Sequence, residues 1–276
     1  MHEHVASKGS LNGVEKGSLS YTEAAMPDAC IVIPAFNEQK NIGRTLASLA
    51  EARRATTLRV RVLIVDNAST DDTAGIAEYS GASVIHEPRK GVARARQAGL
   101  EQAEAPIILG TDADSVVPQR WVEAHARHYR SRENVVGVAG GIRYEDNVHP
   151  LFYLYKAGAF ATQMTVSMLK SVGIGSVSPR RGQSGANFSY LRDEALKIGY
   201  PEEINLGEDM LMGMALAERG AVVRDRSPEN TVHSDARRFR SASQILELAR
   251  KKCTLLLKGQ LYSKVEFAKD FEDIRE

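Results

Sequence analysis

The chain has 276 residues and a formal charge of +1, with 36 Lys and Arg against 35 Asp and Glu. A chain of this length can build one core with appendages, and its balanced charge argues against a nucleic-acid partner. The two cysteines, Cys30 and Cys253, lie far apart and outside any ligand-spaced cluster. This spacing argues against a disulfide framework or a zinc site and favours two buried thiols in a reducing cytoplasm.

Residues 1–27 are rich in Gly, Ser, Lys and Glu and poor in large apolar side chains. Such a segment cannot bury enough surface to order itself alone, so we expect a flexible N-terminal arm. It lacks the apolar stretch of a signal peptide, and no later segment reaches the ~20 apolar residues of a membrane span. We therefore expect a cytoplasmic protein that can be peripheral to a membrane.

From Ala29 onward, short β-branched runs alternate with helical patterns. This rhythm predicts an α/β fold with a mixed, mostly parallel sheet flanked by helices. A first helix is expected where Ile42, Leu46 and Leu49 fall at helical spacing on one face. A second should begin at a capping box at residues 69–72 and end near Gly81, and a third should span residues 91–103. Strands are expected at residues 30–33, 60–65, 84–85 and 107–110.

The second half of the chain is less regular. We expect strands at residues 135–139, 186–191 and 221–223, with helices over residues 150–169 and from Glu208 to just before Gly220. Residues 171–184 have no period and are typical of a functional loop. The predicted domain spans residues 28–235, followed by a helical C-terminal extension over residues 236–276.

Open α/β sheets bind ligands beyond the carboxyl ends of their strands, and four polar sets follow predicted strands here. In the first, residues 34–38, Asn37 or Glu38 can instead cap a helix. In the second, residues 66–71, Asp66 can accept hydrogen bonds from a base or ribose. In the third, residues 89–94, Gly91 permits close backbone approach and a cation lies near a helix start, an arrangement that favours anion binding. The alternative is a solvated surface turn.

The fourth set is Asp112 and Asp114, which flank one small residue at the end of an apolar run. Two carboxylates so close repel each other unless a positive charge lies between them. Mg²⁺ or Mn²⁺ suits such a pair because it takes oxygen ligands and bridges to substrate phosphates. The alternative is a turn with two solvated acids.

Over residues 29–233 the sequence resembles the family 2 glycosyltransferases of the GT-A fold. Residues 34–38 and 65–71 resemble its two nucleotide motifs, with Asn67 where a further Asp is common. The resemblance implies a nucleotide-sugar donor, a divalent cation and an acceptor-lining stretch. By this resemblance the donor contacts are Pro34, Ala35, Phe36, Glu38, Asp66, Lys90, Arg94, Asp112 and Ala113, the metal ligands are Asp112 and Asp114, and the acceptor side is Gly185, Ala186, Asn187 and Glu208.

The same resemblance makes Asp209 the general base that takes the proton of the acceptor hydroxyl. The simpler interpretation of Glu208 and Asp209 is negative charge in the first turn of a helix. One base and one metal imply single displacement with inversion. His233 falls where some members of the fold supply a metal ligand, although a lone His is more often structural.

Arg237 and Arg238 follow closely and can clamp a diphosphate through their guanidinium groups. The Gln-x-x-Arg-Trp signature of processive family members is absent from the sequence. Single addition of a sugar is therefore favoured over polymer synthesis.

The tail from Arg237 to Lys258 mixes basic with apolar residues, as in a helix that lies on an anionic membrane. It can bring the enzyme to a lipid-linked acceptor, or it can pack on the domain or on a partner subunit in a homodimer.

The sequence thus predicts a metal-dependent transferase that moves a sugar from a UDP- or GDP-sugar to a hydroxyl of a sugar, a lipid-linked or a small-molecule acceptor. The alternatives are a sugar-phosphate nucleotidyltransferase and a non-catalytic nucleotide-sugar-binding module. A nucleotidyltransferase normally has a Gly-rich phosphate loop after its first strand, where this chain has Pro34 to Glu38.

Overall fold

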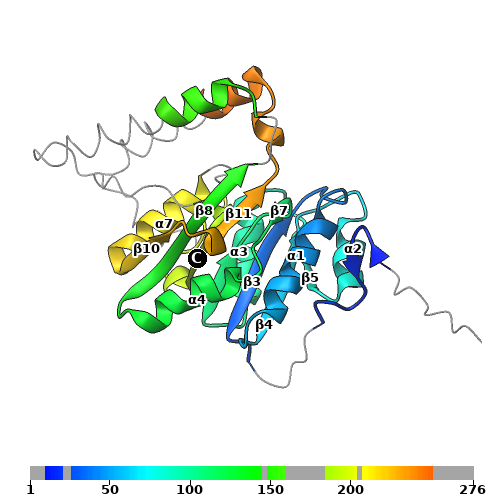
Figure 1. The fold of residues 1–276 in the computed structure, drawn as a ribbon, viewed down its shortest axis with the longest axis vertical. Coiled ribbons are helices and arrows are strands. Elements are labelled where there is room, and N and C mark those ends of the chain that lie inside the picture. The colour runs from blue at the N-terminus through cyan, green and yellow to red at the C-terminus, as the bar shows by residue number, and fades with distance from the viewer. Residues whose placement is uncertain (1–9, 21–25, 145–147, 159–183, 204–206, 251–276) are drawn as a thin grey trace, which may run out of the picture. The chain divides into compact units, whose positions relative to one another are not determined.

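The computed structural model describes residues 10–20, 26–144, 148–158, 184–203 and 207–250 (Figure 1). The chain divides into two compact units, and each is described by itself. Unit 1 comprises residues 1–144 and 182–235, and unit 2 comprises residues 145–181 and 236–276.

Within the described part of unit 1, nine strands form one sheet in the order β5-β4-β3-β6-β9-β8-β11-β7, with β10 paired to β8. The β3, β4, β5 and β6 strands pair in parallel, as do β8, β10 and β11. Antiparallel pairs join β9 to β6 and β8, and β7 to β11. The bounds are β3 Ala29–Ala35, β4 Val60–Asp66, β5 Ser83–His86, β6 Ile107–Gly110, β7 Ser115–Val116, β8 Val135–Tyr144, β9 Phe188–Leu191, β10 Ala221–Asp225 and β11 Thr231–Ser234.

Helices cover both faces of this sheet because its central strands are apolar on both sides. In β3, Ile31 and Ile33 pack in one cluster and Cys30 and Val32 in the other. Each fully buried aliphatic side chain of this kind stabilises the fold by about 1.5–3 kcal/mol. The first cluster includes residues of α1 (Ile42–Arg54), α2 (Thr73–Ser80) and α4 (Trp121–Ser131), and the second includes residues of α3 (Val92–Gln102), α6 (Arg192–Leu196) and α7 (Glu208–Arg219).

The predicted alternation of strands and helices is confirmed, with specific corrections. The capping box is wrong: α2 begins at Thr73 after Asp72, and the Ser69 hydroxyl accepts a hydrogen bond from the Asn37 amide instead. The predicted end of that helix is confirmed, since Gly81 has the left-handed φ of 82°. The sequence interpretation missed α4, β7 and β11, and β8 runs five residues beyond Ala139, to Tyr144.

Part of the expected N-terminal arm is ordered by packing on the rest of unit 1. The strands β1 (Ser10–Leu11) and β2 (Val14–Glu15) form a hairpin, and Val14 and Leu19 are each 1% exposed. The Leu19 amide donates to the Ser80 carbonyl at 2.7 Å, at the end of α2. The side chains of Val14 and Leu19 therefore order this part of the segment by packing into the first core cluster.

Unit 2 has helical segments at residues 151–158 and 242–250, and a 3₁₀ turn at Arg237–Phe239. The Phe152 and Phe239 rings lie 4.6 Å apart, and the His149 amide donates to the Phe239 carbonyl at 2.8 Å. The described residues contain no helix that is long and apolar enough to span a bilayer. Most of the predicted 150–169 helix and of the predicted 171–184 loop lies outside the described residues.

Candidate functional site

The polar sets that follow the strands meet at one edge of the sheet. Register pairs Ala35 with Asp66 and Asp66 with His86, so β3, β4 and β5 end together. At the end of β6, Gly110 pairs with Phe188, the first residue of the antiparallel β9. The Gly185–Asn187 turn, which immediately precedes β9, therefore lies at the same edge as Asp112.

The loops after β3 and β4 are joined into one rigid support. Asn37, with φ of 54°, accepts a hydrogen bond from the Thr70 amide at 2.8 Å through Oδ1. The Glu38 amide donates to the Thr73 hydroxyl at 2.8 Å, and the Glu38 carboxylate accepts from the Asn41 side chain at 2.9 Å. Glu38, which is predicted to contact the nucleotide sugar, thus also makes hydrogen bonds within the protein. These bonds fix the surface that the two loops present.

Phe36 and Lys90 come together at the outer side of this support. The Lys90 ammonium lies 4.8 Å from the centre of the Phe36 ring, and Phe36 is 45% exposed. A cation over an aromatic face is attracted to its electrons. An exposed ring beside a cation is suited to hold a flat, anion-bearing ligand, while the neighbouring Pro34 is half-buried and Ala35 is buried.

Asp66 is nearly inaccessible at the end of β4. It is 5% exposed and accepts from the Ser69 amide at 3.3 Å, and its other oxygen lies 3.1 Å from Nδ1 of His86. His86 is itself well exposed, with 64% of its side chain in solvent. The pair therefore offers a ligand the His86 ring at the surface, with the Asp66 carboxylate behind it.

Asn67 ties the third polar set to the second. Its amide nitrogen donates to the carbonyls of Glu87 at 3.1 Å and Arg89 at 2.8 Å, and its oxygen accepts from the Gly91 amide at 2.8 Å. An aspartate has no N–H to donate. The amide at a position where the family commonly has Asp thus has a local structural reason.

The two arginines of the third set, Arg89 and Arg94, are paired with acids. Arg89 forms ion pairs with Glu87 and Glu202, each at 2.9 Å, and the Arg89 side chain lowers the pKa of Glu87 chiefly by hydrogen bonding. Arg94 lies 3.7 Å from Glu202 and 3.6 Å from Glu203, with 26% of its side chain exposed. A phosphate contact by Arg94 would compete with these two glutamates.

Asp112 and Asp114 follow β6 in a turn whose middle residue, Ala113, is buried and accepts from the Thr45 hydroxyl at 2.9 Å. The Asp112 side chain is 36% exposed, and its Oδ1 accepts from Arg96 at 3.0 Å. Asp114 is 8% exposed and receives the Ser234 hydroxyl at 3.5 Å. The buried Ala113 backbone thus holds the Asp112 carboxylate partly exposed to solvent and the Asp114 carboxylate nearly inaccessible.

This carboxylate pair fits a small divalent cation by its chemistry. Mg²⁺ and Mn²⁺ are commonly held by one or two carboxylates, with waters and substrate phosphates completing the shell. The Arg96 contact uses Oδ1 of Asp112, so the second oxygen is left for a cation. No three His, Cys, Asp or Glu side chains are grouped as a metal site within the described residues, so waters and substrate oxygens would complete the shell of a cation at Asp112 and Asp114.

His233 is not brought into this pair. Val232 and Ser234 are buried and His233 is exposed, so His233 points to the opposite face of β11 from the Ser234 hydroxyl that reaches Asp114. Arg237 and Arg238 belong to unit 2, and the Arg238 side chain lies outside the described residues. The predicted roles of these three residues stay predictions.

Arg96 is a buried cation at the centre of this edge, and the sequence interpretation missed it. Its Nη2 donates to Asp112 and its Nε to Glu208 at 3.1 Å. Burial lowers the pKa of Arg96, but the charges of Asp112 and then Glu208 outweigh burial and raise it above its usual value. A signal existed, because Arg96 lies on the apolar face of α3, three residues after Ala93 and four before Leu100.

The predicted base and its neighbour begin α7 after Gly207, which has the left-handed φ of 86°. Burial raises the pKa of Glu208, Arg96 opposes this, and Asp209 adds to it. The Asp209 carboxylate accepts from the Gly185 amide through one oxygen and from the Met210 amide at 2.7 Å through the other. Asp209 is thereby held on the Gly185 turn, while Glu208 points inward to Arg96.

Asn187 is a structural centre rather than an open acceptor contact. Its Oδ1 accepts from Trp121 and lies 2.9 Å from Nε2 of His125, and its Nδ2 donates to the carbonyls of Gly141 and Asn230. Asn187 is 1% exposed, and all of its hydrogen-bonding groups are satisfied within the protein.

Of the predicted acceptor stretch, Ala186 is also buried, and its carbonyl accepts from the Thr111 hydroxyl at 3.0 Å.

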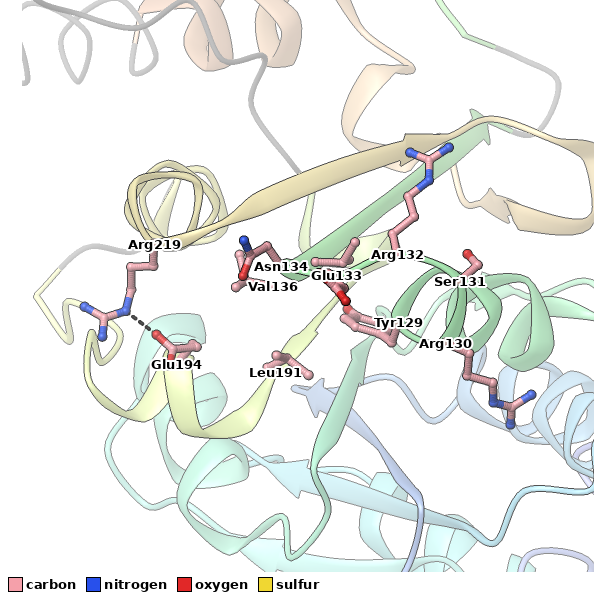
Figure 2. Close-up of a pocket in the computed structure, with 11 residues that line it drawn as sticks. Tyr129, Arg130, Ser131, Arg132, Glu133, Asn134, Val136, Leu191, Glu194 and Arg219 are labelled. Atoms are coloured by element: carbon pink, nitrogen blue, oxygen red, sulfur yellow. Dashed lines mark hydrogen bonds and ion pairs between the residues drawn. The ribbon is translucent and has the colours of Figure 1, made fainter.

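A hollow of about 780 Å³ lies at the other end of the strands (Figure 2). It is lined by the start of β8 at Val135, the end of β9 at Leu191, and the Glu194–Arg219 ion pair. None of the predicted site residues lines it. Because ligands of open α/β sheets bind beyond the carboxyl ends of the strands, the opposite edge with Asp112 is the candidate site.

Comparison with solved structures shows the GT-A fold. The chain superposes on the glucosyl-3-phosphoglycerate synthase of Mycobacterium tuberculosis, in complex with Mn²⁺, UDP and glucosyl-3-phosphoglycerate, with a TM-score of 0.59 and 17% identity over 85% of this chain and 80% of that one. A mannosyltransferase of Pyrobaculum calidifontis, in complex with GDP-Man and Mn²⁺, gives a TM-score of 0.55 and 17% identity. The match covers 80% of this chain and 59% of the mannosyltransferase chain. The predicted fold class is confirmed.

Sequence relatives agree with this fold. The chain is 26% identical to the dolichyl-phosphate hexose transferase of Haloferax volcanii over 75% of this chain and 88% of that protein. It is 42% identical to an uncharacterized glycosyltransferase of M. tuberculosis, where the match spans 30% of this chain and about a third, 35%, of the relative. The profile described as "Glycosyl transferase family 2" matches residues 30–181, more than half of the chain, so the chain belongs to glycosyltransferase family 2.

Proposed function

We propose that this protein is a metal-dependent, inverting, non-processive glycosyltransferase that moves a sugar from a UDP- or GDP-sugar to an acceptor hydroxyl. The observation that carries the proposal is the meeting of Asp66, Asp112 and the Asp209-bearing start of α7 at one sheet edge, with Arg96 linking Asp112 to α7. Family membership and neighbours bound to UDP or GDP-Man support a nucleotide-sugar donor.

In the proposed reaction, the loops after β3 and β4 hold the nucleotide, with Phe36 and Lys90 on its outer side. Asp112 and Asp114 would hold a divalent cation, which would neutralise charge on the departing diphosphate. Asp209, oriented by the amides of Gly185 and Met210, accepts the proton of the acceptor hydroxyl. The acceptor oxygen then bonds to the anomeric carbon as the bond from that carbon to the diphosphate oxygen breaks, which inverts the configuration.

Replacing Asp209 with Asn tests this chemistry, because the amide keeps the shape and cannot accept the proton. Sugar transfer should fall by about 10²–10⁴-fold, whereas binding of UDP or GDP with Mn²⁺, followed as a rise in the thermal midpoint, should persist. Unchanged transfer would exclude this base. Nucleotide binding without transfer by the unaltered protein would favour the non-catalytic binding module. Release of pyrophosphate from UTP or GTP in the presence of a sugar 1-phosphate would favour a nucleotidyltransferase.

We further propose that the acceptor is lipid-linked and that unit 2 contacts the membrane that holds it. The two units differ in charge: unit 2 has 14 Lys and Arg against 8 Asp and Glu, leaving 22 against 27 in unit 1. In unit 2, Tyr153, Leu154 and Leu246 are 63–68% exposed. Basic residues together with exposed apolar ones favour an anionic lipid surface, and the H. volcanii relative is named a dolichyl-phosphate hexose transferase.

Vesicle co-sedimentation tests this surface. Changing Tyr153, Leu154 and Leu246 together to Ser should lower binding to phosphatidylglycerol vesicles by at least about tenfold, because their apolar surface contributes roughly 25 cal/mol per Å² buried. Met26→Ser is the matched control, since Met26 is 67% exposed but belongs to unit 1. Equal sedimentation of both variants and the unaltered protein would remove the proposal.

A further inference from the structure

The Arg96 guanidinium joins two parts of the sheet edge that are far apart in sequence. One arm donates to Asp112, the first carboxylate of the proposed cation pair, and Nε donates to Glu208, the first residue of α7. The side chains of Arg96 and Glu208 are 7% and 6% exposed, and that of Asp112 is 36% exposed. The contact therefore runs from a buried interior to the open side of the site.

Glycine at position 185 makes room for this arrangement. A Cβ atom on Gly185 would lie 2.1 Å from Nη2 of Arg96 and 2.3 Å from its Cζ. The same Gly185 donates its amide hydrogen to the carboxylate of Asp209. The guanidinium thus packs directly beneath the backbone that orients the proposed base.

We propose that Arg96 is a positioning residue that sets the cation-side carboxylate, Asp112, against the base-side helix α7. This inference rests on the proposed function. A planar guanidinium donates in two fixed directions at once, whereas a lysine ammonium at the end of a flexible chain is a point charge. Arg96→Lys therefore keeps the positive charge and removes the fixed angle between the two acids.

The geometry separates two effects. Loss of the Asp112 contact should weaken cation binding, because groups that orient a metal ligand typically contribute 10–100-fold to metal affinity. Loss of the Glu208 contact should misplace Asp209 and lower kcat with little change in cation binding. Arg96→Lys should show both effects. Glu208→Met, which has a similar length and no oxygen to accept from Nε of Arg96, should show the second alone.

The experiment is a Mn²⁺ titration followed by the EPR signal of free Mn²⁺, in saturating UDP or GDP, on the full chain. We expect Arg96→Lys to weaken Mn²⁺ binding by at least about tenfold and Glu208→Met to change it by less than about twofold, while kcat for sugar transfer falls in both. The control is Arg192→Lys, since Arg192 bonds the carbonyls of Leu100 and Glu101 at the far end of α3. That variant should leave Mn²⁺ binding and kcat unchanged.

Far-UV circular dichroism verifies that each variant is folded. Unaltered Mn²⁺ affinity in folded Arg96→Lys overturns the positioning role, even where its thermal midpoint is lower, since a purely structural ion pair would change the midpoint alone. If the unaltered protein binds no Mn²⁺ with either nucleotide, the proposed metal-dependent transfer fails instead, and this inference fails with it. The two failures are therefore distinguishable.

Discussion

The two sides of the candidate site are held together by different interactions. On the nucleotide side, the loops after β3 and β4 are joined mainly by hydrogen bonds between neutral groups, such as Asn37 with Thr70, together with one from the Gln39 amide to the Asp71 carboxylate. On the base side, Arg96 lies between Asp112 and Glu208 with little access to water. A neutral hydrogen bond contributes about 0.5–1.5 kcal/mol, whereas removing one partner of a buried ion pair costs about 3–5 kcal/mol. The base side should therefore be far less tolerant of substitution.

The largest effect is expected from removing the buried cation. Arg96→Met leaves the nearly inaccessible Glu208 carboxyl without its ion-pair partner, so the free energy of unfolding should fall by about 3–5 kcal/mol in urea titrations. Adding Glu208→Gln should recover part of that loss, because the unpaired charge is then absent. If the single and double variants are equally unstable, the stabilisation comes from packing of the Arg96 side chain and not from its charge.

A second effect concerns pH and the buried centre that supports the Gly185–Asn187 turn. Burial lowers the pKa of His125 to about 4, and a hydrogen bond with Asn187 opposes this only in part. The unfolded chain binds a proton below about pH 6.5, so folding stability is full above that pH and is lost as the pH falls toward 4. The loss is at most about 1.4 kcal/mol per pH unit.

The measurement is the free energy of unfolding between pH 7 and pH 4. The slope in this window should be shallower in His125→Gln than in the unaltered protein, because glutamine does not titrate. Equal slopes would mean that His125 is not the group that couples folding to protons. The comparison concerns slopes, since the variant also loses bonds to Asn187 and Ser189.

The contrast between the two sides also explains how much the sequence predicted. Buried parallel strands are continuous apolar runs, so β3, β4 and β6 were evident, and the acids directly after them followed from the rule for strand ends. The link from Arg96 to Glu208 spans 112 positions, and no local pattern specifies such a partner. Only the presence of a cation on an apolar helix face pointed to a buried pair.

Other departures share this physical origin. The family resemblance puts Asn187 on the acceptor side, but Trp121 and His125 of the unpredicted helix α4 bond its oxygen in the interior. The Ser69 hydroxyl was expected to cap α2, but the neighbouring loop supplies a competing donor, the Asn37 amide. In both cases a partner far away in the sequence bonds a polar group to which the sequence pattern or the family resemblance gives another role.

The smallest effect distinguishes an amide that must donate from one that need not. Asn67→Asp removes two donated bonds, to the carbonyls of Glu87 and Arg89, and should lower the free energy of unfolding by about 1–2 kcal/mol. Asn37→Asp is the matched control, because Asn37 bonds Thr70 only through its accepting oxygen and aspartate tolerates the left-handed φ. Its stability should change by less than about 0.5 kcal/mol. Equal losses would mean that added negative charge, and not the missing donors, decides the cost on the nucleotide side.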